Sequence, residues 1–161
     1  LLNLQKKTNG ITEFVPLPFV ADEAPIFRRG QARPGPTFKE TILVHSVARI
    51  LFQGQINNIQ GSWVKMGLPG LKFLLSSGIN DIGGVLMNES ITRSAGASFG
   101  QELQLEEVEG IVNELGLNLQ QRNTLYDSLN SNLQDLISLQ SIPLIPINND
   151  YHKPKKLINI T

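Results

Sequence analysis

The sequence predicts an α/β fold in which parallel strands alternate with helices. Three short apolar segments have strand character, helical patterns separate them, and residues that start or stop helices flank those patterns. The strands are expected over residues 11–19, 56–64 and 79–87. Strands that alternate with helices at this spacing favour parallel pairing, in an open sheet or in part of a (β/α) barrel. In both architectures the functional site lies at the C-terminal ends of the strands.

The helix between the first two strands is expected to start near Phe38. Thr37 and Glu40 have the spacing of a capping box, Pro36 precedes the cap, and Gly54 marks the end of the helical pattern. Its apolar side chains recur roughly on one stripe, which supports the prediction of a helix. The stripe comprises Phe38, Ile42, Val44, Val47, Ala48 and Leu51.

The remaining connections differ in length. Residues 68–77 predict a shorter helix that Gly78 closes with a left-handed cap. The connection over 20–37 is long for a compact domain, and its three arginines are expected to be solvated rather than to bind an anion. We therefore divide the chain into barrel strands and helices over 1–90, a helical region over 91–129, and a low-complexity, partly disordered tail over 130–161.

Size and composition exclude several classes of protein. The 161 residues suffice for about one domain, whereas a complete barrel enzyme needs roughly 250. Fourteen basic and fourteen acidic residues give no net charge, which argues against a nucleic-acid partner. The chain has no cysteine, so it holds no thiolate-ligated metal, and no apolar run approaches the roughly 20 residues of a membrane span. We expect a cytoplasmic protein, and a fragment, because the chain begins without methionine.

The stretch GINDIGGVLMNE, residues 78–89, contains three glycines beside an Asn-Asp pair. Its spacing matches neither a phosphate-binding loop nor a calcium loop. What remains is a strand that ends at a pocket, with Asn80 and Asp81 on opposite faces and one of them directed into the pocket. Gly83 and Gly84 indicate either the close approach of a ligand or a structural bulge.

The second strand carries an unusual row of polar residues. Asn58, Gln60 and Ser62 share one face, with Ile59 and Trp63 on the other. Buried parallel strands are usually apolar throughout, so this row favours a polar pocket over a hydrogen-bonded core network. His45 lies mid-helix without a second ligand at metal-binding spacing, which favours a structural role. For Glu13 and Glu89, catalytic, capping and solvated roles all stay open.

Five segments in order resemble the C-terminal part of a radical S-adenosylmethionine family, the 4-hydroxyphenyl transferase subunits of FO synthase. The resemblance covers roughly Leu1 to Leu129, and the related menaquinone-pathway cyclases are less similar, particularly around VPLPF and GGVLMNE. The segments are ITEFVPLPF, ARPGPTFKE, NNIQGSWVKMG, GINDIGGVLMNESITRSAGASFGQ and QRNTLYDSL.

The resemblance implies the last strands of a (β/α) barrel whose N-terminal half holds a four-iron four-sulfur cluster on three cysteines. The cluster would reduce S-adenosyl-L-methionine to a 5′-deoxyadenosyl radical. That radical would take hydrogen from L-tyrosine, whose side-chain fragment would add to 5-amino-6-(D-ribitylamino)uracil. The implied partners are these two substrates and the N-terminal half of the barrel, with no nucleic acid and no membrane. The alternatives are a dehypoxanthine futalosine cyclase and a truncated, non-catalytic fragment.

The resemblance also implies roles for particular residues. Cofactor binding near the adenosine is expected for Phe14, Val15 and Pro16. Substrate binding is expected for Asn58, Gln60, Trp63 and Asn80, and catalysis for Asp81 and Glu89. Asp81 would lie with the amides at the polar strand ends, and Trp63 and Glu89 near the rim.

Overall fold

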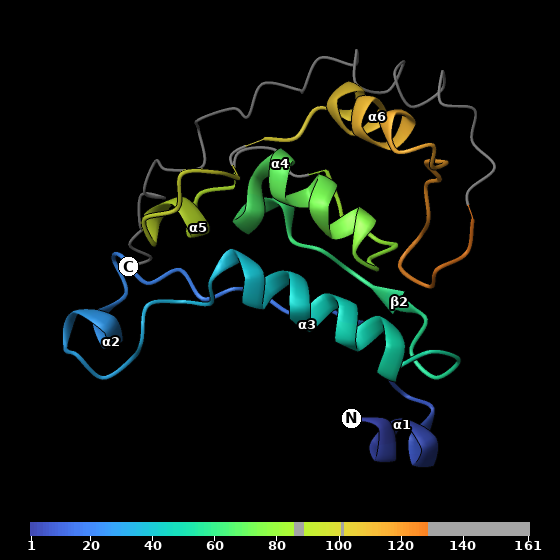
Figure 1. The fold of residues 1–161 in the computed structure, drawn as a ribbon, viewed down its shortest axis with the longest axis horizontal. Helices are drawn as coiled ribbons and strands as arrows, with labels where there is room; N and C mark the ends of the chain where they lie inside the picture. The colour runs from blue at the N-terminus through green and yellow to red at the C-terminus, as the bar shows by residue number, and fades with distance from the viewer. Residues whose placement is uncertain (86–88, 101, 129–161) are drawn as a thin grey trace, which may run out of the picture. The chain divides into compact units, whose positions relative to one another are not determined.

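The computed structural model describes residues 1–85, 89–100 and 102–128, which form helices joined by short strands (Figure 1). The chain clusters into one compact unit, Leu1–Leu119, and a second, Gln120–Thr161. None of the helices in the described part is long and apolar enough to cross a membrane. The elements in order are α1 (Leu2–Thr8), β1 (Glu13–Phe14), α2 (Pro25–Arg28), α3 (Phe38–Leu51), β2 (Asn58–Ile59), α4 (Trp63–Ser76), α5 (Ile91–Ser94) and α6 (Leu105–Glu114).

The strands pair in parallel, as the alternation of strands and helices predicts. β1 pairs with β2 so that Phe14 lies opposite Ile59, and Gln60 just beyond β2 forms a parallel bridge with Asp81. Three parallel segments therefore lie in chain order, with α3 and α4 in the two connections, and Figure 1 shows these helices side by side. This arrangement is a partial α/β domain.

The paired strands are shorter than the predicted ones, for a different reason at each position. In the first, pairing is confined to Glu13–Phe14, and Pro16 and Pro18 beyond it have no N–H to donate to a neighbouring strand. The second ends early because α4 starts at Trp63, so that residue is helical and not part of a strand. The third is a single bridge at Asp81, and the expected residues 86–87 lie outside the described part.

A turn ends the third segment directly after its bridge. The Asp81 carboxylate oxygen Oδ1 accepts a hydrogen bond from the Gly83 N–H at 2.6 Å, and Gly83 has φ +74°. An aspartate that binds the backbone two residues later forms a local turn, which competes with strand pairing. The structure thus has a local turn at Gly83, and the ligand approach expected for the glycine pair stays a prediction.

Helix α3 begins as predicted, with a complete capping box. The Thr37 hydroxyl accepts from the Glu40 N–H at 3.2 Å, and the Glu40 carboxylate accepts from the Thr37 N–H at 2.7 Å. Two of the donors that a helix N-terminus leaves unpaired are satisfied in this way. The helix ends before Gly54, whose φ is +73°.

The helix that the apolar stripe predicts is present, but most of the stripe is not its buried face. The buried residues are Thr41, His45 and Ala48, of which only Ala48 belongs to that stripe. The two polar members are accommodated because the Thr41 hydroxyl donates to the Thr37 carbonyl at 3.1 Å and His45 Nδ1 lies 2.7 Å from the Thr41 carbonyl oxygen. Most of the predicted apolar stripe is exposed instead, at Phe38, Val44, Val47 and Leu51.

The Glu40 carboxylate makes α3 sensitive to acid. The Thr37 backbone N–H, and then the Arg33 side chain, lower the pKa of Glu40 below its ordinary value of 4.5. A lowered carboxylate pKa contributes stability above the unfolded-state pKa, and this contribution is lost as pH falls through the folded-state pKa. We expect Glu40→Gln to lower the midpoint of urea unfolding at pH 7. Well below pH 4.5, the midpoints of the variant and of the unmodified protein should become equal. A difference between the two proteins that is as large at this low pH as at pH 7 would contradict this assignment.

Helix α4 starts five residues before the predicted position and is interrupted. Gly67 has φ 65° and ψ 176°, which separates a first turn at Trp63–Met66 from the longer second part. The ring of Phe99 covers this break, since a Cβ on Gly67 would lie 2.8 Å from its Cδ1 atom. Pro69 is tolerated because it lies in the first turn of the second part, where its missing N–H has no helical partner.

Helix α6 packs against α4 and completes the core of the first unit. Val108 and Val112 of α6 are buried, and Lys72 of α4 forms an ion pair with Glu114. The buried core side chains come from helices, strands and the loop before α6. They are Ala48, Phe52, Ile56, Ile59, Trp63, Val64, Leu71, Leu74, Ile79, Leu103, Val108 and Val112.

Gly110 lies inside α6 at an exposed position. A Cβ there would have no neighbour within 4 Å in the part of the chain that the structure describes, and the φ of Gly110 is not in the left-handed region. Because glycine in a helix interior costs about 1 kcal/mol relative to alanine, Gly110→Ala is expected to raise the free energy of unfolding by about that amount. Chemical denaturation measures the change, and a lower stability of the variant would show that this face of α6 is covered.

In the second unit, residues 120–128 form a turn. Arg122 bridges Ser128 in antiparallel fashion, and the Arg122 guanidinium lies 4.0 Å from the centroid of the Tyr126 ring. Asn123 Oδ1 accepts hydrogen bonds from the Leu125 and Asp127 N–H groups, both at 2.9 Å. The expected low-complexity tail from residue 130 lies outside the described residues.

Candidate functional site

Four polar residues share one face of the three parallel segments. Glu13 lies opposite Asn58, and Gln60 lies opposite Asp81. Residues directly opposite on adjacent strands project to the same face, and so do residues two apart on one strand. Glu13, Asn58, Gln60 and Asp81 therefore form one surface, which we call the polar face.

Helices cover the other face of the strands. The Phe14 ring packs edge to face on Phe52, with ring centroids 5.0 Å apart. Ile59 is fully buried, and a Cβ on Gly61 would lie 3.0 Å from Leu74 Cδ1 of α4. Because apolar side chains and α3 and α4 occupy this face, the polar face is on the side away from these two helices.

The residues expected near a cofactor adenosine lie at the end of β1. The Phe14 ring is directed toward α3, and the Phe14 carbonyl accepts the Gln60 N–H at 3.0 Å. The Phe14 side chain is therefore directed away from the polar face, so that only its backbone lies near a ligand there. Val15 and Pro16 are half-buried just beyond β1, and their cofactor role stays a prediction.

Asp81, and not Asn80, is the member of the Asn-Asp pair on the polar face. Asp81 is 8% exposed, and its carboxylate holds the turn at Gly83. The Asn80 side-chain oxygen instead accepts from the Ile59 N–H at 2.9 Å and from Arg49 Nη2 at 2.5 Å. Asn80 therefore belongs to the framework that joins the strands to α3.

Arg49 is the centre of that framework. Its guanidinium also donates to the Gly78 carbonyl at 2.6 Å and to the Asn57 carbonyl at 2.8 Å. Partial burial lowers the pKa of Arg49, because desolvation disfavours its charge. One side chain of α3 thus binds the chain before β2 and the chain before the third segment.

Trp63 and Glu89, expected near the rim, both make local contacts. Trp63 is 4% exposed, and its indole N–H donates to the Gly84 carbonyl at 3.1 Å. It ties the start of α4 to the glycine turn. Both Glu89 carboxylate oxygens accept from the Thr92 N–H, at 3.0 and 3.2 Å, which caps α5. The capping role left open for Glu89 is therefore present, and its catalytic role stays a prediction.

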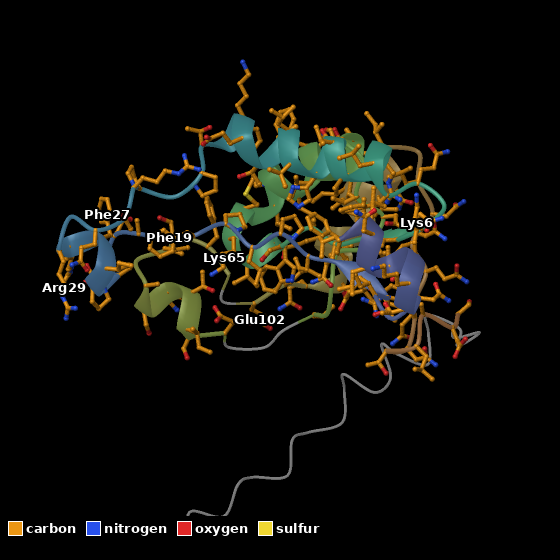
Figure 2. All side chains as sticks on the ribbon, turned by 90° about the horizontal axis from the view of Figure 1, so that it is seen from below. Lys6, Phe19, Phe27, Arg29, Lys65 and Glu102 are labelled. Carbon is orange, nitrogen blue, oxygen red and sulfur yellow. The ribbon has the colours of Figure 1, made fainter. Side chains whose placement is uncertain are left out.

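The long connection between β1 and α3 pairs two of its three arginines. Arg28 forms an ion pair with Glu23, and Arg33 with Glu40 at 3.1 Å. Arg29, directly after α2, is exposed (Figure 2). The Glu23 N–H also donates to the Ala95 carbonyl at 3.1 Å, which joins this connection to the chain after α5.

Sequence reasoning did not select Glu13 as a site residue. Its place on the polar face depends on the register between β1 and β2, which no local pattern specifies. A second residue not used by the predicted site is His45, which is 1% exposed and whose Nε2 has no hydrogen-bond partner among the residues that the structure describes.

The described residues do not fit a metal cluster. No group of three or more histidine, aspartate or glutamate side chains within the described ranges could hold a metal ion. The whole chain has no cysteine, so thiolate ligands for an iron–sulfur cluster would have to come from outside it.

Comparison with known families decides the affiliation of the chain. The family model described as the CofH/MqnC C-terminal region matches residues 8–134. The chain belongs to this family. The five resembling segments all lie within the match, so the recognition of the family from these segments is confirmed.

Curated relatives of this chain agree with this affiliation. A 5-amino-6-(D-ribitylamino)uracil–L-tyrosine 4-hydroxyphenyl transferase of Methanopyrus kandleri is 50% identical over 127 residues, 79% of this chain and 34% of the relative. The transferase of the same name from Methanothermobacter thermautotrophicus is 48% identical over 126 residues, 78% of this chain and 34% of the relative. An FO synthase of Nocardia farcinica is 40% identical over 147 residues, 91% of this chain and 16% of the relative. The chain thus spans about a third of the archaeal relatives' length and less of the FO synthase.

Proposed function

We propose that the chain supplies the C-terminal part of a radical S-adenosylmethionine transferase of deazaflavin biosynthesis. This enzyme would join the 4-hydroxybenzyl group of L-tyrosine to 5-amino-6-(D-ribitylamino)uracil. The observation that carries the proposal is the 50% identity, over four-fifths of the chain, to a transferase named for these two substrates. Identity at this level over a whole structural unit supports a shared ligand chemistry.

The polar face supports the proposal independently of the names. Both substrates carry many hydrogen-bonding groups, and small-molecule sites fix such ligands with a few well-placed polar side chains. Carboxylates and carboxamides supply donors and acceptors in this chain on one face, near the C-terminal ends of parallel strands. Ligands of α/β folds bind at these ends.

The first alternative, a menaquinone-pathway cyclase, is not favoured. The matching family model includes both branches, but the relatives described above carry transferase and FO synthase names. The second alternative is a non-catalytic fragment that retains the fold. Product formation by the full-length protein separates both from the proposal.

An N-terminal half of the same barrel is the proposed partner. An apolar groove of about 330 Å³ runs between β1 and the exposed side of α3. Exposed apolar side chains of this kind usually mark a contact surface. A further strand and helix beside β1 would cover this groove, and the longer relatives have the additional length. The groove is lined by Phe14, Leu43, Val44, Val47, Ala48, Leu51 and Phe52.

The cofactors of the proposal are S-adenosyl-L-methionine and a four-iron four-sulfur cluster. When bound, the pair supplies a carbon radical that can take hydrogen from an unactivated position. Because this chain has no cysteine, the cluster ligands are placed in the proposed N-terminal half. The contribution of this chain is to bind and orient the substrates on the polar face.

The test is product formation by the full-length protein. The protein is purified without oxygen, its cluster is reconstituted, and it is incubated with S-adenosylmethionine, tyrosine and the ribityl-aminouracil. Mass spectrometry is expected to detect the uracil carrying the 4-hydroxybenzyl group. Turnover of dehypoxanthine futalosine in place of these substrates would establish the cyclase, and a reading frame without a three-cysteine motif would exclude both activities.

A further inference from the structure

The Gln60 carboxamide lies on the polar face without a hydrogen bond to any of the residues that the structure describes. Its backbone is fixed on both sides, because its N–H donates to the Phe14 carbonyl at 3.0 Å and the next N–H, of Gly61, donates to the Asp81 carbonyl at 2.9 Å. Its side chain is half-buried. The donor and the acceptor of this half-buried carboxamide therefore have room for hydrogen bonds to a ligand, and its rigid backbone fixes where they lie.

The glycine turn after Asp81 determines where this carboxamide lies. A Cβ on Gly83 would lie 2.6 Å from Gln60 Nε2 and 3.1 Å from Gln60 Cδ. The carboxamide therefore packs against the Gly83 backbone, in the space that the Cβ atom of any other residue type would occupy. The φ of +74° at Gly83 independently favours glycine.

The Asp81 carboxylate holds this turn in place. Its Oδ1 atom accepts the Gly83 N–H at 2.6 Å, and Asp81 lies directly opposite Gln60. The contact fixes the backbone against which the carboxamide packs. Asp81 is thus linked to a ligand at Gln60 through Gly83.

We propose that Gln60 is the residue that recognises a nitrogen heterocycle and that Asp81 is its positioning residue rather than a catalytic base. A carboxamide offers one donor and one acceptor side by side, which match a heterocycle edge that presents the same pair. The uracil ring has this edge at its imide, and the adenine of S-adenosylmethionine has one as well. The inference rests on the proposed function for the identity of these ligands.

The test measures three binding constants in the full-length protein with its cluster reconstituted. Gln60→Leu removes the polar edge at similar volume, Gln60→Glu keeps the acceptors and removes the donor, and Gln53→Leu is the control at an exposed glutamine. We expect both Gln60 variants to weaken binding of one heterocyclic ligand, the ribityl-aminouracil or S-adenosylmethionine, about tenfold or more. Tyrosine binding should not change, nor should any constant in the control.

The ligand whose binding is weakened identifies the heterocycle. Selective weakening of ribityl-aminouracil binding or of S-adenosylmethionine binding supports the proposal. Unchanged binding of both heterocyclic ligands would overturn it. So would an equal loss for all three ligands with an unchanged melting temperature. If wild-type protein binds these ligands but makes no 4-hydroxybenzyl product, the proposed function fails while the Gln60 comparison still gives its own answer.

The role of Asp81 is tested by a pair of variants. Asp81→Ala removes the acceptor for the Gly83 N–H, whereas Asp81→Asn keeps an oxygen in that place. For a positioning residue, Asp81→Ala raises the KM for the heterocyclic ligand about tenfold with little change in kcat, and Asp81→Asn restores most of the loss. A kcat that collapses equally in both variants at saturating substrate would show that Asp81 acts as a base.

Discussion

Replacing Arg49 with methionine is expected to lower the free energy of unfolding by about 3 kcal/mol, because hydrogen bonds from a charged donor are worth roughly 1.5–3 kcal/mol each and are not additive. The guanidinium donates to the Gly78 and Asn57 carbonyls and to the Asn80 side chain. Methionine fills much of the same space but leaves all three acceptors without this donor. Urea denaturation of the full-length protein measures the loss.

Two further variants separate the guanidinium geometry from its charge. Arg49→Lys keeps the charge but lacks the planar fork that reaches three acceptors, so it should recover less than half of the loss. Arg93→Met is the matched control, because Arg93 is an exposed arginine at the end of α5 and should change stability by less than about 0.5 kcal/mol. Equal stability of the Arg49→Met and Arg93→Met variants would show that the framework contributes nothing.

Local signals in the sequence predicted the start of α3 and the C-terminal ends of α3 and α4 well. The capping box at Thr37 and Glu40 and the terminal glycines act within a few residues of the helix ends that they determine. The parallel order of the strands was also predicted, because alternation with helices leaves few other arrangements. These parts of the fold depend little on distant contacts.

The errors arose where distant contacts decide the outcome. Helix α3 buries Thr41 and His45 although they are polar, because the Thr41 hydroxyl and His45 Nδ1 both bind carbonyls one turn earlier in the chain. Its apolar residues Val44 and Val47 are exposed beside β1. An apolar stripe indicates a helix, but it does not show which side of that helix packs against the rest of the domain.

For the candidate site, alternation placed Asn58 and Gln60 on one face, as the register of the strands shows. It could not choose between Asn80 and Asp81, because that choice depends on pairing with Gln60 across 21 residues of sequence. It also gave no sign that the Asn80 oxygen is engaged by Arg49. Long-range pairing, rather than residue type, decides which amide lies on the polar face and which belongs to the framework.

Replacing Gly35 with alanine is expected to destabilise the connection between β1 and α3 by about 2–4 kcal/mol, the range of severe packing conflicts. A Cβ on Gly35 would lie 2.0 Å from the Phe19 carbonyl oxygen and 3.1 Å from its carbon. The obstacle is backbone and cannot rotate away as a side chain would. The two ends of the loop that carries α2 must therefore move apart.

Limited proteolysis and chemical denaturation should both detect this change. Cleavage in the loop over 20–34 should become faster in Gly35→Ala, because the two ends no longer meet. Gly84→Ala is the matched control, since a Cβ at Gly84 would have no neighbour within 4 Å among the described residues and the φ of Gly84 is not in the left-handed region. If both variants resist protease and denaturant like the unmodified protein, the close approach of Phe19 and Gly35 is not required. If only Gly35→Ala is cleaved faster, that approach is what closes the loop.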